Sequence, residues 1–245
     1  MNRIDTFVAA VGLAGDSRSS ESRVEADFIA THLALPRGAR ILDLPCGNGR
    51  VAVLLARKGY RVVGADVSRT CIGIARARSA HPNVGYAVRN VNAVIGRREQ
   101  FDAVVSLYTC IGYLPSDAEN EQALRSLTSV LPRGGKLILS TANGPVSARH
   151  SGNVTAFDTG RYVIRRSDHY DSDRRIMTRR FAVLDRSTDV RRRYVHQQRL
   201  YSNAEMFSLL GSCGLGCIRT FADCHGRPFD RDRAPHVVYI GTKQV

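Results

Sequence analysis

The apolar and polar residues of the chain fall into short blocks that predict strands and helices in alternation. Between residues 41 and 141, apolar runs typical of buried strands alternate with segments that carry apolar residues on one side only, as helices do. The predicted strands are 41–44, 60–65, 84–88, 101–108 and 136–140, and the predicted helices are 24–35, 50–58, 69–79 and 116–131. This alternation predicts an α/β fold with a parallel, doubly wound sheet.

The pattern changes after residue 142. Residues 143–160 are rich in turn-forming residues, and strand-like runs separated by polar turns follow at 161–170, 176–185 and 190–201, which predicts a small antiparallel β meander. A helix at 205–212 and a hairpin of strands at 216–221 and 236–242 complete the pattern. We therefore predict a main domain formed by residues 1–142 and 202–245, with residues 143–201 as a β insert.

The stretch Ile41–Arg50, with the sequence ILDLPCGNGR, joins the first predicted strand to the next helix. Gly47 and Gly49 lack a Cβ atom, so the backbone can turn tightly and a ligand can approach it. The spacing Gly47-x-Gly49-x-x-Ala52 fits the dinucleotide-binding pattern, which is a weak signal by itself. Asp43, four residues before Gly47, favours a second class of cofactor, which carries an ammonium group, a carboxylate and a ribose instead of a pyrophosphate.

With Asp43 included, the stretch resembles the first motif of the class I S-adenosylmethionine-dependent methyltransferases. The resemblance covers residues 35–142 by motif, including FDAVVSLYTCIGYL and LTSVLPRGGKLILSTANG, and residues 200–245 by pattern. It implies a mostly parallel seven-stranded sheet with an antiparallel C-terminal strand, S-adenosyl-L-methionine as the cofactor, and the β insert as a lid. A dinucleotide-dependent oxidoreductase would need a second mononucleotide-binding half or a catalytic signature, and the sequence shows neither.

Asp66 ends the second predicted strand, seventeen residues after Gly49. A carboxylate at this place can accept hydrogen bonds from both hydroxyls of a ribose. The alternative is an acid at a helix start, but Ser68 already suits the N-cap of the next helix. At the end of the third strand the family often carries an acid that binds the adenine amino group. Asn90, or Asn92, stands there and can accept the same bond, although a simple turn asparagine is equally consistent.

The resemblance assigns the amino-acid end of the cofactor to Asp43, Gly47 and Gly49, and the ribose to Asp66. The full set of residues expected to bind the cofactor is Asp43, Pro45, Cys46, Gly47, Gly49, Asp66, Val67, Asn90, Val91, Leu107 and Tyr108.

The expected reaction moves a methyl group from a sulfonium to a nucleophile. The leaving group is already good, so a base is needed only when the acceptor is a hydroxyl or a protonated amine. The candidates for the catalytic site are Tyr108, Tyr113 and His150, and the resemblance also places Thr109 close to the reacting methyl group. Of these, Tyr108 is better suited to shaping the pocket than to moving a proton.

The net charge is +14, and residues 161–200 contribute half of it with twelve arginines and five aspartates. This stretch could be a solvated outer face, a surface that attracts an anionic small acceptor, or an RNA-binding surface. Because it lacks a recognised RNA-binding signature, we expect a small-molecule acceptor, with RNA or a peptide as the weaker alternative. An NAD(P)-dependent oxidoreductase and a non-catalytic cofactor-binding protein are the remaining alternatives.

No apolar run is long enough to predict a membrane span, and the N-terminal residues do not read as a signal peptide. The six cysteines lack a disulfide-type spacing, which indicates a cytoplasmic protein with reduced thiols. Cys213, Cys217 and the pair Cys224-His225 do not have the spacing of a common zinc site, so we expect buried cysteines and no metal. The sequence indicates no oligomeric state.

Overall fold

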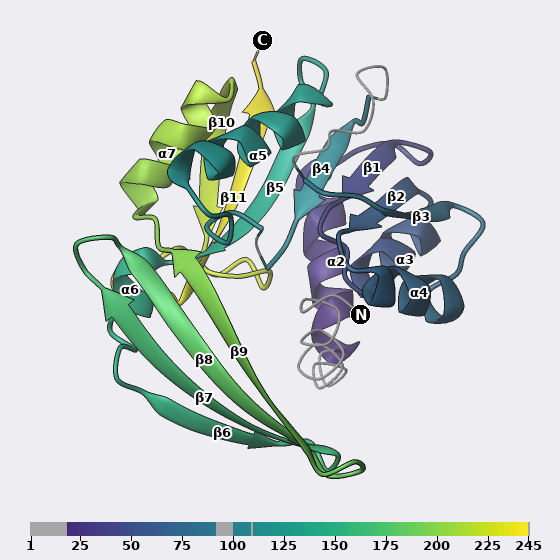
Figure 1. Cartoon of the computed structure of the whole chain (residues 1–245). Helices are drawn as coiled ribbons and strands as arrows, with labels where there is room; N and C mark the ends of the chain where they lie inside the picture. Colours follow the sequence, from purple (N-terminus) through teal and green to yellow (C-terminus); the bar gives the residue numbers. More distant parts are fainter. Residues whose placement is uncertain (1–18, 92–99, 109, 245) are drawn as a thin grey trace.

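A computed structural model describes residues 19–91, 100–108 and 110–244. Seven strands form one sheet in the order β10-β11-β5-β4-β1-β2-β3 (Figure 1). Their bounds are β1 Arg40–Asp43, β2 Arg61–Asp66, β3 Val84–Val88, β4 Ala103–Ser106, β5 Lys136–Ala142, β10 Leu215–Phe221 and β11 His236–Lys243. Strand β11 runs antiparallel to both of its neighbours, and the other pairs are parallel. The predicted α/β class and mostly parallel seven-stranded sheet with an antiparallel last strand are confirmed.

Helices cover both faces of this sheet. Helices α2 (Ser19–Leu33) and α3 (Arg50–Arg57) share one apolar cluster with the sheet. Helices α5 (Asp117–Ser129) and α7 (Asn203–Ser212) share another, and α4 (Arg69–Arg78) contacts β2 and β3. Because successive side chains of a strand point to opposite faces, strands covered on both sides read as continuous apolar runs, which is why the sequence predicted them.

Serine side chains cap the N-termini of three helices, close to the starts that the sequence predicted. Ser68 accepts the amide three residues further on and begins α4. Ser116 caps α5 by accepting the Glu119 amide at 3.2 Å, and its hydroxyl donates to the Glu119 carboxylate at 2.9 Å. Ser202 and Glu205 form the complete capping box of α7, which starts two residues earlier than predicted.

The insert forms a second, four-stranded antiparallel sheet, called the lid from here on. Its strands, in spatial order, are β6 Val154–Asp158, β7 Tyr162–Asp171, β8 Ile176–Asp185 and β9 Val190–Arg199. In Figure 1 the lid projects away from the seven-stranded sheet, next to the short helix α6 (Gly144–Ala148). The three predicted lid strands are present as β7, β8 and β9, but the prediction of a turn-rich 143–160 missed α6 and β6. All five residues of β6 are exposed, so no alternation of buried and exposed positions marks it.

Helix α2 begins at Ser19, five residues before the predicted start. Within the parts of the chain that the structure describes, no helix is both long and apolar enough to span a bilayer.

Candidate active site

The glycine turn joins β1 to α3 at the carboxyl edge of the sheet. Gly47 and Gly49 have φ angles of 55° and 79°, which L-residues rarely adopt. A Cβ atom on Gly49 would lie 2.5 Å from the Tyr86 hydroxyl, whereas one on Gly47 would meet no atom within 4 Å. The absence of a side chain at Gly49 is therefore required by packing against β3, while the open space beside Gly47 is where a ligand can approach the backbone.

Asp66, the last residue of β2, connects this turn to the start of α4. Its Oδ2 accepts the Gly47 amide at 2.9 Å, and its Oδ1 accepts the Ser68 amide at 2.8 Å. A carboxylate has about four acceptor positions, so these two bonds are compatible with further bonds from ribose hydroxyls. Asp66 is thus placed where a ribose-binding acid is expected, and it also fixes the shape of the turn.

The buried carboxyl group of Asp43 lies near the Arg50 guanidinium and near two further carboxylates, Asp66 and Glu25. Burial raises the pKa of Asp43 to about 8, an effect that Arg50 opposes and that Asp66 and Glu25 reinforce. The Asp43 Oδ2 atom has no hydrogen-bond partner among the described residues. Glu25, on α2, forms an ion pair with Arg50, the first residue of α3.

At neutral pH Asp43 holds its proton, so two carboxylates, Glu25 and Asp66, oppose the single guanidinium of Arg50. This negative balance disfavours the pyrophosphate of a dinucleotide, which would add charge of the same sign. A ligand with an ammonium group would be attracted and would favour ionisation of Asp43. The residues at the turn therefore fit S-adenosylmethionine better than NAD(P).

Tyr108 follows β4 and links the candidate site to α2. Its φ angle is 57°, which is unusual for a residue with a Cβ atom. Its amide donates to Ser140 Oγ at 2.8 Å, its hydroxyl donates to the Glu25 carboxylate, and the Arg50 guanidinium lies 5.2 Å from the ring centre. Several contacts thus hold Tyr108 in a strained conformation, as is common at functional sites. Sequence analysis missed Glu25 because no motif marks it.

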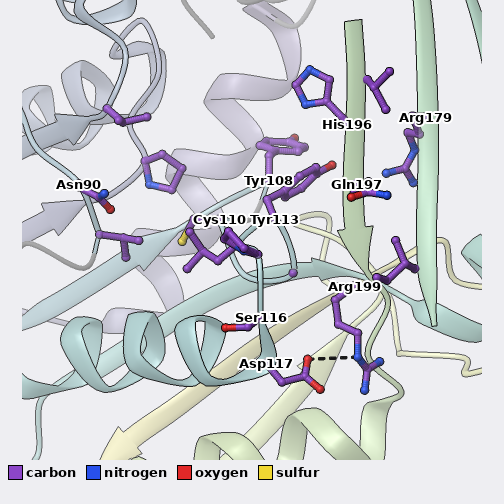
Figure 2. A pocket seen from close by; sticks show the side chains of 18 of the residues that line it. Asn90, Tyr108, Cys110, Tyr113, Ser116, Asp117, Arg179, His196, Gln197 and Arg199 are labelled. Carbon is purple, nitrogen blue, oxygen red and sulfur yellow. Dashed lines mark ion pairs between the residues drawn. The ribbon is translucent and has the colours of Figure 1, made fainter. Parts of the chain in front are cut away.

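A cavity of about 1170 Å³ lies between the carboxyl edge of the sheet and the lid (Figure 2). The predicted site residues that line it are Pro45, Asp66, Val67, Asn90, Val91, Tyr108 and Tyr113. Figure 2 shows Asn90 on the sheet side, Arg179 and His196 on the lid side, and Tyr108 and Tyr113 between them. One continuous space is therefore bounded by candidate cofactor residues and by the lid.

The remaining predicted site residues do not line this cavity. They are the buried Asp43, Cys46 and Leu107, the turn residues Gly47 and Gly49, and His150. His150 is exposed at the end of α6, where its Nδ1 lies 3.3 Å from Asn153 Nδ2, so the structure does not bring it together with the two tyrosines. A catalytic role for His150 stays a prediction. Asn92 and Thr109 lie outside the described residues.

The lid contributes cavity residues that sequence analysis did not identify. They are Arg174, Ile176, Arg179 and Phe181 from β8 and the turn before it, and Val195, His196, Gln197 and Arg199 from β9. The period of two along a strand indicates that Arg179 and Phe181 share a face. Which face meets the cavity depends on how the lid is placed against the main sheet, and no local pattern carries that information.

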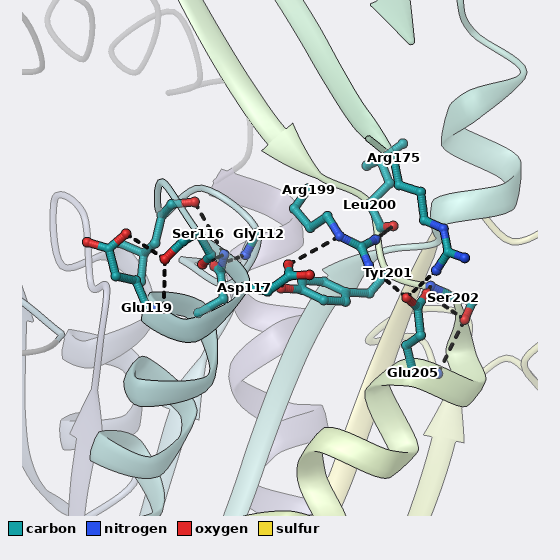
Figure 3. A network of polar contacts seen from close by, with 12 residues as sticks. Gly112, Ser116, Asp117, Glu119, Arg175, Arg199, Leu200, Tyr201, Ser202 and Glu205 are labelled. Carbon is teal, nitrogen blue, oxygen red and sulfur yellow. Dashed lines mark hydrogen bonds and ion pairs between the residues drawn. The ribbon is translucent and has the colours of Figure 1, made fainter. Parts of the chain in front are cut away.

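A network centred on Arg199 fixes the end of β9 to the main domain (Figure 3). Arg199 Nε lies 3.2 Å from Asp117 Oδ1 at the start of α5, and Nη2 lies 2.7 Å from Glu205 Oε1 at the start of α7. Burial alone would raise the Glu205 pKa, but a backbone amide at the helix N-cap and Arg199 outweigh it and bring the pKa to about 2. The Arg199 amide also donates to the Gly112 carbonyl at 2.7 Å, next to Tyr113. These contacts therefore attach the lid to the main domain at the wall of the cavity, next to Tyr113.

Within the described residues, no group of three or more histidine, cysteine or acidic side chains could hold a metal ion. All six cysteines are free thiols. Cys213 is buried, as expected, but Cys217 is exposed, so the interpretation of both as buried small residues holds only for Cys213.

The chain is similar in sequence to known methyltransferases. Residues 41–135 match a family model described as a methyltransferase domain. The ubiquinone biosynthesis O-methyltransferase of Xanthomonas campestris pv. campestris is 33% identical over 150 residues, which are 60% of this chain and 61% of that protein. The match thus spans less than two thirds of the length of this curated relative.

Solved structures agree on the fold. The CcbJ methyltransferase from Streptomyces caelestis is 23% identical, with a TM-score of 0.78 over 92% of this chain and 90% of that one. CalS10 from Micromonospora echinaspora, an amino pentose methyltransferase solved with S-adenosylmethionine bound, is 21% identical, with a TM-score of 0.68 over 98% and 97% of the two chains. Residues 41–135 are therefore a methyltransferase domain, and the chain has the class I, Rossmann-like fold of the S-adenosylmethionine-dependent methyltransferases.

Proposed function

We propose that this protein transfers a methyl group from S-adenosylmethionine to a nitrogen, oxygen or carbon atom of a small molecule. The observation that carries the proposal is the cavity, which Asp66 and Asn90 bound on one side and lid residues on the other. A cofactor at the sheet edge and an acceptor under the lid would share this space, so the two reacting atoms could meet inside it.

The residues around the turn suit the functional groups of this cofactor. Asp66 would accept hydrogen bonds from the ribose hydroxyls, and the Asn90 side-chain oxygen would accept one from the adenine amino group. The amino-acid end would lie in the open space beside Gly47, near the buried Asp43. Because Asp43 does not line the cavity, we assign it an electrostatic role and not a direct contact.

Cofactor binding should release a proton from Asp43. The pKa of about 8 leaves this carboxyl protonated at pH 7, and a nearby ammonium group lowers that pKa. We therefore expect the affinity for S-adenosylhomocysteine, the demethylated product, to rise as pH increases from 6 towards 8. Calorimetry in buffers of different ionisation enthalpy would measure the released proton. The Asp43→Asn variant should lose this release, and an unchanged proton count in the variant would remove Asp43 from this role.

The cofactor supplies a methyl group on a sulfonium, which is already a good leaving group. The protein can therefore act mainly by alignment, a contribution of about 7–11 kcal/mol in favourable cases. Tyr108 and Tyr113 are the predicted catalytic residues that line the cavity, and we assign them to shaping the space around the reacting atoms.

A hydroxyl or protonated amine acceptor also needs a group that takes its proton, and His196 can do this. Its ring lines the cavity and packs edge-on against Phe181 at 5.8 Å between centroids. Burial, with a smaller contribution from Arg179, lowers the His196 pKa below 6.5. The imidazole is therefore neutral at pH 7 and able to accept a proton.

This assignment predicts the acid side of the pH profile. At saturating S-adenosylmethionine, we expect kcat/KM for the acceptor to be flat near pH 7 and to fall as pH drops through the lowered His196 pKa, below 6.5. The Arg179→Gln variant removes one cause of the lowering, so its acid limb should move towards 6.5. An acid limb that persists unchanged in the His196→Asn variant would show that another group takes the proton.

The acceptor that we propose is a small anionic metabolite in the cytoplasm. Free thiols agree with a reducing compartment. The related proteins act, by their names, in ubiquinone biosynthesis and on an amino pentose, which supports a small biosynthetic metabolite here. Cavity-lining arginines support the anionic character.

Transfer of a labelled methyl group tests the proposal. Purified protein is incubated with methyl-labelled S-adenosylmethionine and either a small-molecule extract of the source cells, total RNA or a protein extract of those cells. We expect the label in the small-molecule fraction only, and only with protein that can bind the cofactor. Label in RNA or in protein would contradict the proposed acceptor class. Cofactor binding without label in any fraction would favour a non-catalytic binding protein.

A further inference from the structure

The cavity side of the lid carries a row of polar side chains across three strands. The strand registers place Asp168 of β7 opposite Arg179 of β8, and Arg179 opposite His196 of β9. Directly opposed residues of antiparallel strands point to the same face of a sheet. Arg179 and His196 both line the cavity, so this row faces the acceptor side of the proposed active site.

The guanidinium of Arg179 is held in place by a hydrogen bond to Gln198 and an ion pair with Asp168, both of which are buried. Its Nη1 donates to Gln198 Oε1 at 2.6 Å, and its Nε lies 3.8 Å from Asp168 Oδ2. The Asp168 side chain is 1% exposed and that of Arg179 is 16% exposed. No hydrogen bond among the described residues uses the Arg179 Nη2 atom. A fixed planar guanidinium with donors left over is suited to bind a carboxylate or a phosphate.

The charges around Arg179 do not balance. Asp168 also accepts the Arg166 Nε at 2.7 Å, so one carboxylate serves two guanidinium groups. Arg199, on the same wall, is paired with Asp117 of α5 and with Glu205 of α7, and Glu205 is shared with Arg175. His196 carries no charge at neutral pH. One positive charge in a partly desolvated wall therefore lacks a counterion, and an anion in the cavity would supply it.

We propose that Arg179, positioned by Asp168 and Gln198, binds an anionic group of the methyl acceptor, either a carboxylate or a phosphate ester. The role as an acceptor site rests on the proposed methyltransferase function, but the binding of an anion at Arg179 can be measured without any turnover. The acceptor's reactive atom would then face the sheet edge, since its anionic end is fixed at the lid.

The test is a calorimetric titration of protein saturated with S-adenosylhomocysteine, at constant ionic strength. The probes are benzoate, phenyl phosphate and the uncharged benzyl alcohol. Arg179→Gln removes the charge and Arg179→Lys keeps the charge but loses the planar fork. Arg180→Gln is the matched control, because Arg180 is the next residue of β8, is exposed and does not line the cavity.

We expect at least one anion to bind wild-type protein and the Arg180→Gln variant equally. Its affinity should fall about tenfold or more in Arg179→Gln and less in Arg179→Lys, and the stronger of the two anions identifies the acceptor's group. Equal binding to wild type and Arg179→Gln, or binding of benzyl alcohol as strong as that of the anions, would overturn the proposal.

The same titration separates this proposal from the proposed function. S-adenosylhomocysteine is titrated first, and the anions are also titrated without it. Failure of S-adenosylhomocysteine to bind wild type, with anion binding retained, would contradict the methyltransferase function and leave Arg179 as an anion site. Normal S-adenosylhomocysteine binding with no anion binding would contradict the anion site at Arg179 and leave the proposed methyltransferase function unaffected.

Discussion

Replacing Asp66 with alanine is expected to weaken S-adenosylhomocysteine binding by at least about 100-fold. The Asp66 carboxylate accepts the Gly47 and Ser68 amides and lies at the cavity, where two ribose hydroxyls would add further bonds. A hydrogen bond to a charged group contributes about 1.5–3 kcal/mol, and 1.4 kcal/mol is a factor of ten in affinity. Calorimetric titration of the variant measures the loss.

Asp102→Ala is the matched control for Asp66→Ala. Asp102 also accepts a backbone amide, that of Arg40 at 2.7 Å, but it lies before β4, at the opposite edge of the sheet. Both variants lose a side chain that accepts a backbone amide, but only Asp66→Ala should lose affinity for S-adenosylhomocysteine. Equal affinity in Asp66→Ala and wild type would remove Asp66 from ribose binding. An equal loss in both variants would show that the effect is one of general stability.

Replacing Gly49 with alanine is expected to destabilise the fold by about 2–4 kcal/mol. A residue with a Cβ atom costs about 1–2 kcal/mol in the left-handed conformation that Gly49 adopts. The new methyl group would also lie 2.5 Å from the Tyr86 hydroxyl and 2.8 Å from two ring carbons, so the packing of β3 must shift. For a chain of this size the melting temperature should fall by roughly 5–15 °C.

Gly47→Ala should have the opposite balance of effects. Gly47 has a similar backbone conformation, with a φ angle of 55°, but its new methyl group would meet no protein atom within 4 Å. We expect a smaller loss of stability than in Gly49→Ala and a larger loss of affinity for S-adenosylhomocysteine. Thermal unfolding and calorimetry of the two variants separate packing from ligand contact. A Gly47→Ala variant that binds as tightly as wild type would show that the cofactor does not use this space.

The main sheet could be predicted from local sequence because each of its elements carries a local signal. Strands covered on both faces appear as apolar runs, and the serine caps Ser68, Ser116 and Ser202 mark the starts of three helices. Gly59 closes α3 with a φ angle of 98°, as a glycine after a helix does. In the lid, β6 has no buried side and therefore carries no such signal.

The candidate site likewise contains residues that local sequence predicts and residues that only tertiary packing brings in. Asp66 and Asn90 could be predicted because they lie at or just after the carboxyl ends of parallel strands, which meet at one edge of the sheet. Glu25, Arg179 and His196 reach the turn or the cavity from α2 and the lid, which are distant in sequence. Their positions follow from tertiary packing. His150, by contrast, was selected for its side-chain chemistry, and the structure places it outside the cavity, so its catalytic role stays a prediction.

The most direct test of the central claim is calorimetric titration of the wild-type protein with S-adenosylhomocysteine, using NADH as the control ligand. The two ligands represent the two cofactor classes that the glycine turn allows. The negative charge contributed by Glu25 and Asp66 favours S-adenosylhomocysteine over NADH. We predict micromolar binding of S-adenosylhomocysteine and no binding of NADH. Binding of NADH, or no binding of S-adenosylhomocysteine, would contradict the assignment of this cavity to a methyltransferase.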